Sequence, residues 1–188
     1  DIYGEVRLTQ LLKELEKVDG LDWIRLMYLY PVHFGDDLIE TIANSKKILP
    51  YLDMPLQHIN DTMLKRMQRR VNRDQTVTLV EKLRANIPNL VLRTTFISGF
   101  PGETDADFQA TLDLVKEIDF DHSYSFIYSK RPGTPASLLP DDIPLSVKKE
   151  RLNVLQHQLN QQGARISRGM VGSTQTILIT GKSKKSDE

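Results

Sequence analysis

The sequence contains no cysteine in 188 residues. The chain by itself therefore forms no disulfide, thiolate zinc site, cysteine-ligated iron–sulfur cluster or cysteine nucleophile. Histidine is also scarce, and the four histidines have no metal-ligand spacing: His33, His58, His122 and His157. No Ser-His-Asp order or carboxylate pair is evident. We accordingly predict no protein-only metal site and assign no catalytic residue.

An excess charge of one sign is lacking too, because 25 Lys and Arg balance 25 Asp and Glu. Any electrostatic attraction to nucleic acid must therefore be local. The longest apolar runs, 49–56 and 120–128, are strand-sized and far short of a membrane span. We expect a cytoplasmic protein without membrane association. The first residue is Asp1 and no leader precedes it, so we also expect a chain cut from a longer one.

Hydrophobic periodicity predicts helices that alternate with strands. The predicted strands are 23–30, 49–56, 90–98 and 120–129, and the predicted helices are 8–18, one around 38–42, one around 63–67, 74–86, 105–117 and 146–168. This order implies an α/β fold with a parallel sheet, either an open doubly wound sheet or a barrel. Four parallel strands rarely close, so a barrel would need further strands at the amino end.

The C-terminal end is predicted to start a second unit. Gly169 and Gly172 break the last helix, and 174–180 alternates like a single strand with no hairpin partner. We therefore divide the chain into 1–168, the α/β part, and 169–188, a linker with the first strand of a small β domain.

The strand 90–98 leads into a glycine-rich turn, Gly-Phe-Pro-Gly-Glu at 99–103. Turns at the carboxyl ends of parallel strands are where α/β folds bind ligands, and glycine lets main chain approach closely. The alternative is a tight connection that only satisfies backbone geometry. Glu103 favours a ligand, since an acid there can accept hydrogen bonds from a ribose or an amine. Gln57 and His58 end the preceding strand on the same edge.

Basic residues give a second candidate surface. Five cations fall within nine positions, namely Lys65, Arg66, Arg69, Arg70 and Arg73. Such a run is usually solvated helix surface, but in a neutral chain it also suits RNA phosphates. Arg93, on a predicted core strand, must reach an acid or a ligand carboxylate. Arg131 opens a proline-rich loop, 131–135, that either shapes a pocket or only connects.

Together these motifs resemble those of the radical S-adenosylmethionine methylthiotransferases over nearly the whole chain. The segments that carry the resemblance are 28–31, 54–61, 64–69, 93–104, 124–129, 131–135 and 160–162. The resemblance implies a partial, six-stranded parallel barrel, truncated here at its N-terminal side. It also implies a 4Fe-4S cluster that binds S-adenosylmethionine and cleaves it to a 5′-deoxyadenosyl radical, a second cluster in an amino-terminal domain, and a small RNA-binding domain after the barrel.

The resemblance also indicates site residues. The segment 94–103 is similar to the part that contacts the cofactor's adenosine, so the expected cofactor-binding residues are Gln57, Arg93, Thr95, Ile97, Gly99, Gly102 and Glu103. The expected RNA contacts are the five cations of 65–73 together with Arg131. The family's three-cysteine loop is absent from this sequence, so we expect the chain to be inactive without the missing N-terminal segments.

The resemblance leaves the substrate open. Segment 51–60 is similar to the branch that modifies an aspartate of a ribosomal small-subunit protein, whereas 121–135 is similar to the branch that methylthiolates a tRNA adenosine next to the anticodon. A chimeric chain is therefore one interpretation. The position of loop 131–135 favours tRNA adenosine; the alternatives are the ribosomal protein and a non-catalytic RNA-binding fragment.

Overall fold

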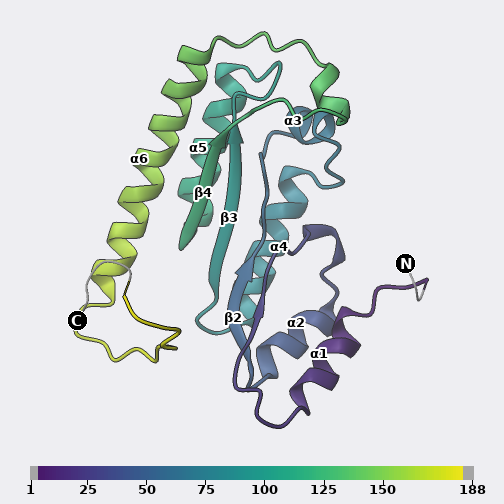
Figure 1. Cartoon of the computed structure of the whole chain (residues 1–188), viewed down its shortest axis with the longest axis vertical. Helices are drawn as coiled ribbons and strands as arrows, with labels where there is room; N and C mark the ends of the chain where they lie inside the picture. The colour runs from purple at the N-terminus through teal and green to yellow at the C-terminus, as the bar shows by residue number, and fades with distance from the viewer. Residues whose placement is uncertain (1–3, 184–188) are drawn as a thin grey trace.

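The computed structural model describes residues 4–183 as a parallel sheet covered by helices on one face (Figure 1). The strands, in spatial as in chain order, are β1 (Ile24–Leu26), β2 (Ile48–Asp53), β3 (Val91–Ser98) and β4 (His122–Ile127). The helices are α1 (Leu8–Glu16), α2 (Asp36–Asn44), α3 (Asp61–Arg66), α4 (Arg73–Asn86), α5 (Asp105–Ile118) and α6 (Leu145–Gly169), with 3-10 turns η1 (Pro31–His33) and η2 (Pro135–Leu138). The predicted α/β fold with four parallel strands is confirmed.

Side-chain caps fix where the helices near the strand ends begin. The Asn60 carboxamide oxygen accepts hydrogen bonds from the N–H groups of Thr62 and Met63 at the start of α3. At α5, Thr104 and Asp107 form a reciprocal capping box. Each cap satisfies backbone donors that a helix start leaves free. The chain that leaves β3 is therefore held in one geometry before it enters α5.

The two faces of the sheet differ. On β3, Leu92, Thr94, Phe96 and Ser98 are buried toward the helices. Arg93, Thr95 and Ile97 point the other way and are partly exposed. We call this second side the open face. In Figure 1 helices α4 and α5 lie behind the sheet and α6 runs along β4, so the core forms between sheet and helices, as alternating side chains require.

The end of the chain departs from the prediction. Residues 174–180 are all exposed, and the structure assigns them no strand. No strand of the described part pairs with them, and an unpaired strand leaves its backbone groups unsatisfied. The domain boundary at 169 remains a prediction. Within residues 4–183, no helix combines the length and apolar character needed to cross a bilayer.

Candidate functional site

Three neighbouring strand ends turn through left-handed backbone. Tyr28 follows β1 with a φ of 58°, Gln57 follows β2 with 72°, and Gly99 follows β3 with 73°. Glycine adopts this conformation freely, whereas tyrosine and glutamine are strained there. Strain of this kind clusters at ligand-binding sites. We call Tyr28, Gln57 and the turn 99–103 the rim.

Gln57 is built into the sheet and offers one unused polar atom. Its N–H donates to the Thr95 carbonyl (2.8 Å), and its own carbonyl accepts from the Ile97 N–H (2.9 Å). The side-chain oxygen Oε1 is buried and has no hydrogen-bond partner in the described structure. A buried acceptor without a partner is costly unless a ligand or water completes it. The rim residue Gln57 therefore carries a buried acceptor that has no partner in the described structure.

The two glycines of the turn face other parts of the protein. A Cβ on Gly99 would lie 2.5 Å from Lys148 Cγ, and a Cβ on Gly102 would lie 2.4 Å from Arg66 Nη1. The Gly102 N–H donates to Asp142 Oδ1 at 2.9 Å, and this hydrogen bond, more than any other contact, lowers the pKa of Asp142. The turn is thus clamped by α3, α6 and the segment before α6.

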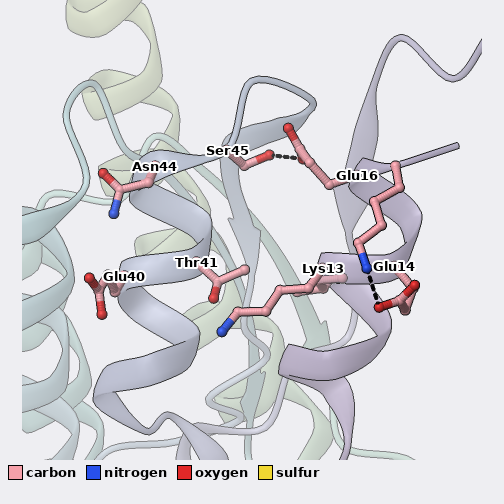
Figure 2. Close-up of a pocket in the computed structure, with 9 residues that line it drawn as sticks. Lys13, Glu14, Glu16, Glu40, Thr41, Asn44 and Ser45 are labelled. Atoms are coloured by element: carbon pink, nitrogen blue, oxygen red, sulfur yellow. Dashed lines mark hydrogen bonds and ion pairs between the residues drawn. The ribbon is translucent and has the colours of Figure 1, made fainter. Parts of the chain in front are cut away.

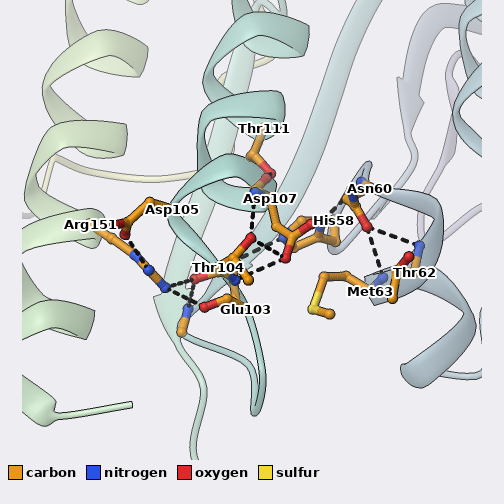
Figure 3. A network of polar contacts seen from close by, with 11 residues as sticks. His58, Asn60, Thr62, Met63, Glu103, Thr104, Asp105, Asp107, Thr111 and Arg151 are labelled. Carbon is orange, nitrogen blue, oxygen red and sulfur yellow. Dashed lines mark hydrogen bonds and ion pairs between the residues drawn. The ribbon is translucent and has the colours of Figure 1, made fainter.

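Glu103 is buried within a network of polar contacts inside the protein (Figure 3). Its side chain is 1% exposed, and Oε1 lies 3.1 Å from His58 Nε2. Oε2 accepts from the Gly99 N–H (2.8 Å) and from Arg151 Nη1 (2.8 Å), while Arg151 Nη2 reaches Asp105 (2.6 Å). Because the carboxylate is buried and both of its oxygens have partners inside the protein, it holds the turn in shape.

Arg93 meets an acid, as expected for a charge on a core strand. Its Nε lies 3.4 Å from Asp53 Oδ1, with the two side chains 12% and 1% exposed. The guanidinium also donates to the Tyr51 hydroxyl (3.5 Å) and lies over the Tyr124 ring, 4.4 Å from its centre. Burial opposes the charge, but the Tyr51 hydrogen bond and Asp53 outweigh it and raise the pKa of Arg93.

The five cations of 65–73 do not form one patch. Arg69 packs inward, where Nη2 donates to the Pro55 carbonyl (2.6 Å) and burial lowers its pKa. Arg73 pairs with Glu117, and Arg66 lies over Gly102. Lys65 and Arg70 are exposed, and their side chains have no partner among the described residues. Arg131 is likewise exposed in the loop after β4.

Several site residues were missed in the sequence. Asp53 and Arg151 support Arg93 and Glu103, and Asp142 caps the Gly102 N–H. Asp142 and Arg151 lie some forty residues or more from their partners in the chain, so no local spacing could indicate them. Asp53 had a signal, because a charged residue on a predicted core strand next to the strand of Arg93 suggests an ion pair.

A groove of about 640 Å³ lies elsewhere, between α1 and α2 (Figure 2). It is lined by Leu12, Lys13, Glu14, Glu16, Lys17, Glu40, Thr41, Asn44 and Ser45. Ser45 lies three residues before β2 begins, so this groove is at the amino ends of the strands, opposite the rim. We assign it no ligand. In the described part of the chain, no three His, Asp or Glu side chains come close enough to hold a metal ion.

A parallel sheet with helices on one face and a strained rim at its carboxyl ends defines a partial (β/α) barrel. The family model of the radical SAM superfamily matches residues 3–115. The chain therefore belongs to this superfamily, whose members use S-adenosylmethionine and 4Fe-4S clusters. The fold agrees, since a radical S-adenosylmethionine methyltransferase from Kitasatospora setae superposes with a TM-score of 0.57 at 19% identity, over 69% of this chain and 26% of that one.

Relatives of known name resemble the chain more closely. The tRNA-2-methylthio-N(6)-dimethylallyladenosine synthase of Pseudomonas fluorescens (strain Pf0-1) is 47% identical over 95% of this chain and 40% of its own length. The enzyme of the same name from Francisella tularensis subsp. novicida is 48% identical over 96% of the chain and 41% of its own length. The chain thus spans about two-fifths of the length of these curated relatives.

Proposed function

We propose that this chain is part of the catalytic barrel of a radical S-adenosylmethionine methylthiotransferase that modifies a tRNA adenosine next to the anticodon. One observation carries the proposal: 47–48% identity to synthases of that name over 95–96% of the chain. The similarity extends through both the 51–60 and the 121–135 segments, which favours tRNA over a ribosomal protein and a single origin over a chimera. A tRNA substrate also implies a cytoplasmic location.

The rim suits the nucleoside part of S-adenosylmethionine. Gln57 Oε1 is a buried acceptor without a partner, which an amino or hydroxyl group of a nucleoside would complete. Backbone groups of Thr95 and Ile97 are already used by Gln57, so these two residues would meet the ligand through side chains on the open face. Gly99, Gly102 and Glu103 would act by giving the turn its shape.

An iron–sulfur cluster does not fit this chain, because it has no cysteine. Thiolate ligands would have to come from residues outside this sequence. When bound, cofactor and cluster supply the radical chemistry that replaces a C–H bond by C–S–CH3. The part assigned to this chain is to bind and orient the nucleoside and to exclude water around it.

The direct test is a fusion of this chain with those parts of the Pseudomonas fluorescens relative that lie outside the match. The anaerobically reconstituted fusion is supplied with S-adenosylmethionine, a reductant and, in parallel, tRNA or a ribosomal small-subunit protein. We expect methylthio-adenosine in the tRNA by mass spectrometry. Methylthiolation of the protein only, or of neither substrate while the unaltered relative is active, would refute the proposal.

A second test addresses Gln57 alone. Gln57→Gly relieves the left-handed strain but removes the acceptor, so affinity for S-adenosylhomocysteine should fall about 5- to 10-fold, as expected for one lost hydrogen bond, without loss of stability. Gln68→Gly is the matched control, since Gln68 is also left-handed (φ 55°) but exposed at the end of α3. Equal affinity of Gln57→Gly and Gln68→Gly for S-adenosylhomocysteine would exclude Gln57 from the site.

A further inference from the structure

A row of alternating arginine and tyrosine side chains crosses the open face, one from each strand. The guanidinium of Arg25 on β1 lies 4.1 Å from the ring centre of Tyr51 on β2. Arg93 on β3 donates to the Tyr51 hydroxyl and lies 4.4 Å from the ring centre of Tyr124 on β4. Contacts between a guanidinium and a ring face orient both groups. Each tyrosine is therefore held at a set angle to the sheet.

The row ends in an exposed aromatic platform on β4, made of Tyr124 and Phe126. Their rings are stacked, with centres 6.3 Å apart and planes inclined by 25°. Tyr124 is 44% exposed and Phe126 is 54% exposed. Arg93 covers part of Tyr124, and the His122 ring meets the Tyr124 ring edge-on at 5.1 Å. Ring surface kept open on a supported platform is typical of a binding surface.

The platform lies next to the rim. Phe126 pairs in register with Ile97, and Tyr124 pairs with Thr95, so the rings continue across β3 toward the turn 99–103. A flat ligand on Phe126 would therefore be adjacent to a nucleoside bound at the rim. Two groups that react with each other must be bound side by side in this way.

The chemistry around the platform selects a nucleobase. On the open face Arg25 lies against Tyr51 and Arg93 pairs with the buried Asp53, and the exposed Lys130 and Arg131 follow β4. A stacked aromatic surface with guanidinium groups beside it suits a base with its phosphate, whereas a peptide aspartate carries no ring to stack.

We infer that Tyr124 and Phe126 stack the target base of a single-stranded RNA, with Arg93 as the positioning residue that fixes the Tyr124 ring. The inference rests on the proposed function for the identity of that base as the substrate. Residues 124 and 126 then determine which substrate lies beside the rim, while Gln57 and the turn hold the cofactor's nucleoside.

The test uses this chain and a short single-stranded RNA that carries 2-aminopurine, whose fluorescence is quenched by stacking. Affinity is measured by fluorescence anisotropy. Tyr124→Ala and Phe126→Ala should each weaken binding roughly 10- to 100-fold and reduce the quenching, because one base–aromatic stack is lost. Tyr124→Phe keeps the ring and should bind within about threefold of the parent. An RNA with an abasic residue at the probe position should bind as weakly as the alanine variants.

Val154→Ala is the matched control, since Val154 is 45% exposed like the platform residues but belongs to α6 and not to the sheet. Far-UV circular dichroism and urea unfolding check that each variant is folded. Unchanged affinity and quenching in Tyr124→Ala and Phe126→Ala would overturn the inference, as would a folded chain that binds no RNA. So would RNA binding that depends only on Lys65 and Arg70. Loss of quenching in the fusion would show that protein covers the platform, which also overturns it.

The assay needs neither cofactor nor cluster, so its outcome is separable from that of the proposed function. An active fusion with alanine variants that bind RNA normally would reject the platform and keep the function. If this chain stacks the base but the fusion is inactive, the platform is kept and the proposed function is rejected.

Discussion

Replacing Arg151 by methionine removes the guanidinium that contacts the buried Glu103 carboxylate. Arg151 donates to Glu103 Oε2 at 2.8 Å and to the Glu103 carbonyl at 3.0 Å, and the Glu103 side chain is 1% exposed. Loss of one partner of a buried pair costs about 3–5 kcal/mol, because a charge stays behind without compensation. Since Glu103 keeps its hydrogen bonds to Gly99 and His58, we expect the lower end, about 3 kcal/mol, or roughly 6–12 °C in Tm.

Urea unfolding followed by the fluorescence of Trp23, the single tryptophan, measures this cost. Arg165→Met is the matched control on the same helix. Arg165 pairs with Asp119 at the surface, the two side chains being 58% and 40% exposed, and such pairs contribute about 0–1 kcal/mol. If Arg151→Met costs no more than Arg165→Met, the buried pair does not support the turn.

A double-mutant cycle separates the charge effect from lost packing. Glu103→Gln in the Arg151→Met background replaces the uncompensated carboxylate with a neutral amide, so the double variant should regain part of the lost stability. We expect a coupling free energy of about 1–3 kcal/mol between the two positions. Strictly additive effects would contradict the assignment of a buried ion pair and would leave packing as the explanation.

Two further predictions concern the same turn. Gly99→Ala and Gly102→Ala share a left-handed strain of about 1–2 kcal/mol. Only Gly99→Ala drives a Cβ into the stem of the buried Lys148, so its free energy of unfolding in urea should fall by about 1–3 kcal/mol more. Equal losses in the two variants would refute the packing argument. Because the pKa of Asp142 is lowered in the folded protein, its hydrogen bond to Gly102 should stabilise the turn at neutral pH and be lost as the pH falls through that lowered value. NMR hydrogen-exchange protection of the Gly102 amide should therefore fall only below about pH 4, the ordinary pKa of an aspartate, in the parent and stay flat in Asp142→Asn; identical profiles would exclude this linkage.

The fold was largely predictable because its periodicities are local. All four strands and six helices occur near their predicted positions, since alternation on β3 and helical spacing on α5 need only neighbouring residues. The boundaries were less accurate. The strand expected over 23–30 pairs only over Ile24–Leu26, and Tyr28 then leaves the extended conformation. The strand expected from 120 starts at His122, because Asp121 closes a loop onto the Leu92 backbone.

The position of the candidate site in the fold could be predicted from the sequence, but the contacts of its side chains could not. Strand order alone brings Gln57 and the turn 99–103 to one edge, because parallel strands end together. Which way Glu103 faces depends on Arg151, 48 residues further along the chain, and a linear motif carries no information on that pairing. The same holds for the five cations of 65–73, which look alike in the sequence although Arg69 is packed inward and Lys65 is exposed.

The presence of glycine at positions 99 and 102 has a different explanation from the one that the sequence suggests. Close approach to a ligand would explain them, but the space beside Gly99 is filled by Lys148 and the space beside Gly102 by Arg66. Their N–H groups are also taken, by Glu103 and Asp142. The protein's own packing and the positive φ angles therefore account for both glycines. Packing does not account for Gln57, which is strained and has a buried oxygen without a partner in the described structure. This residue is therefore the observation that supports ligand binding at the rim.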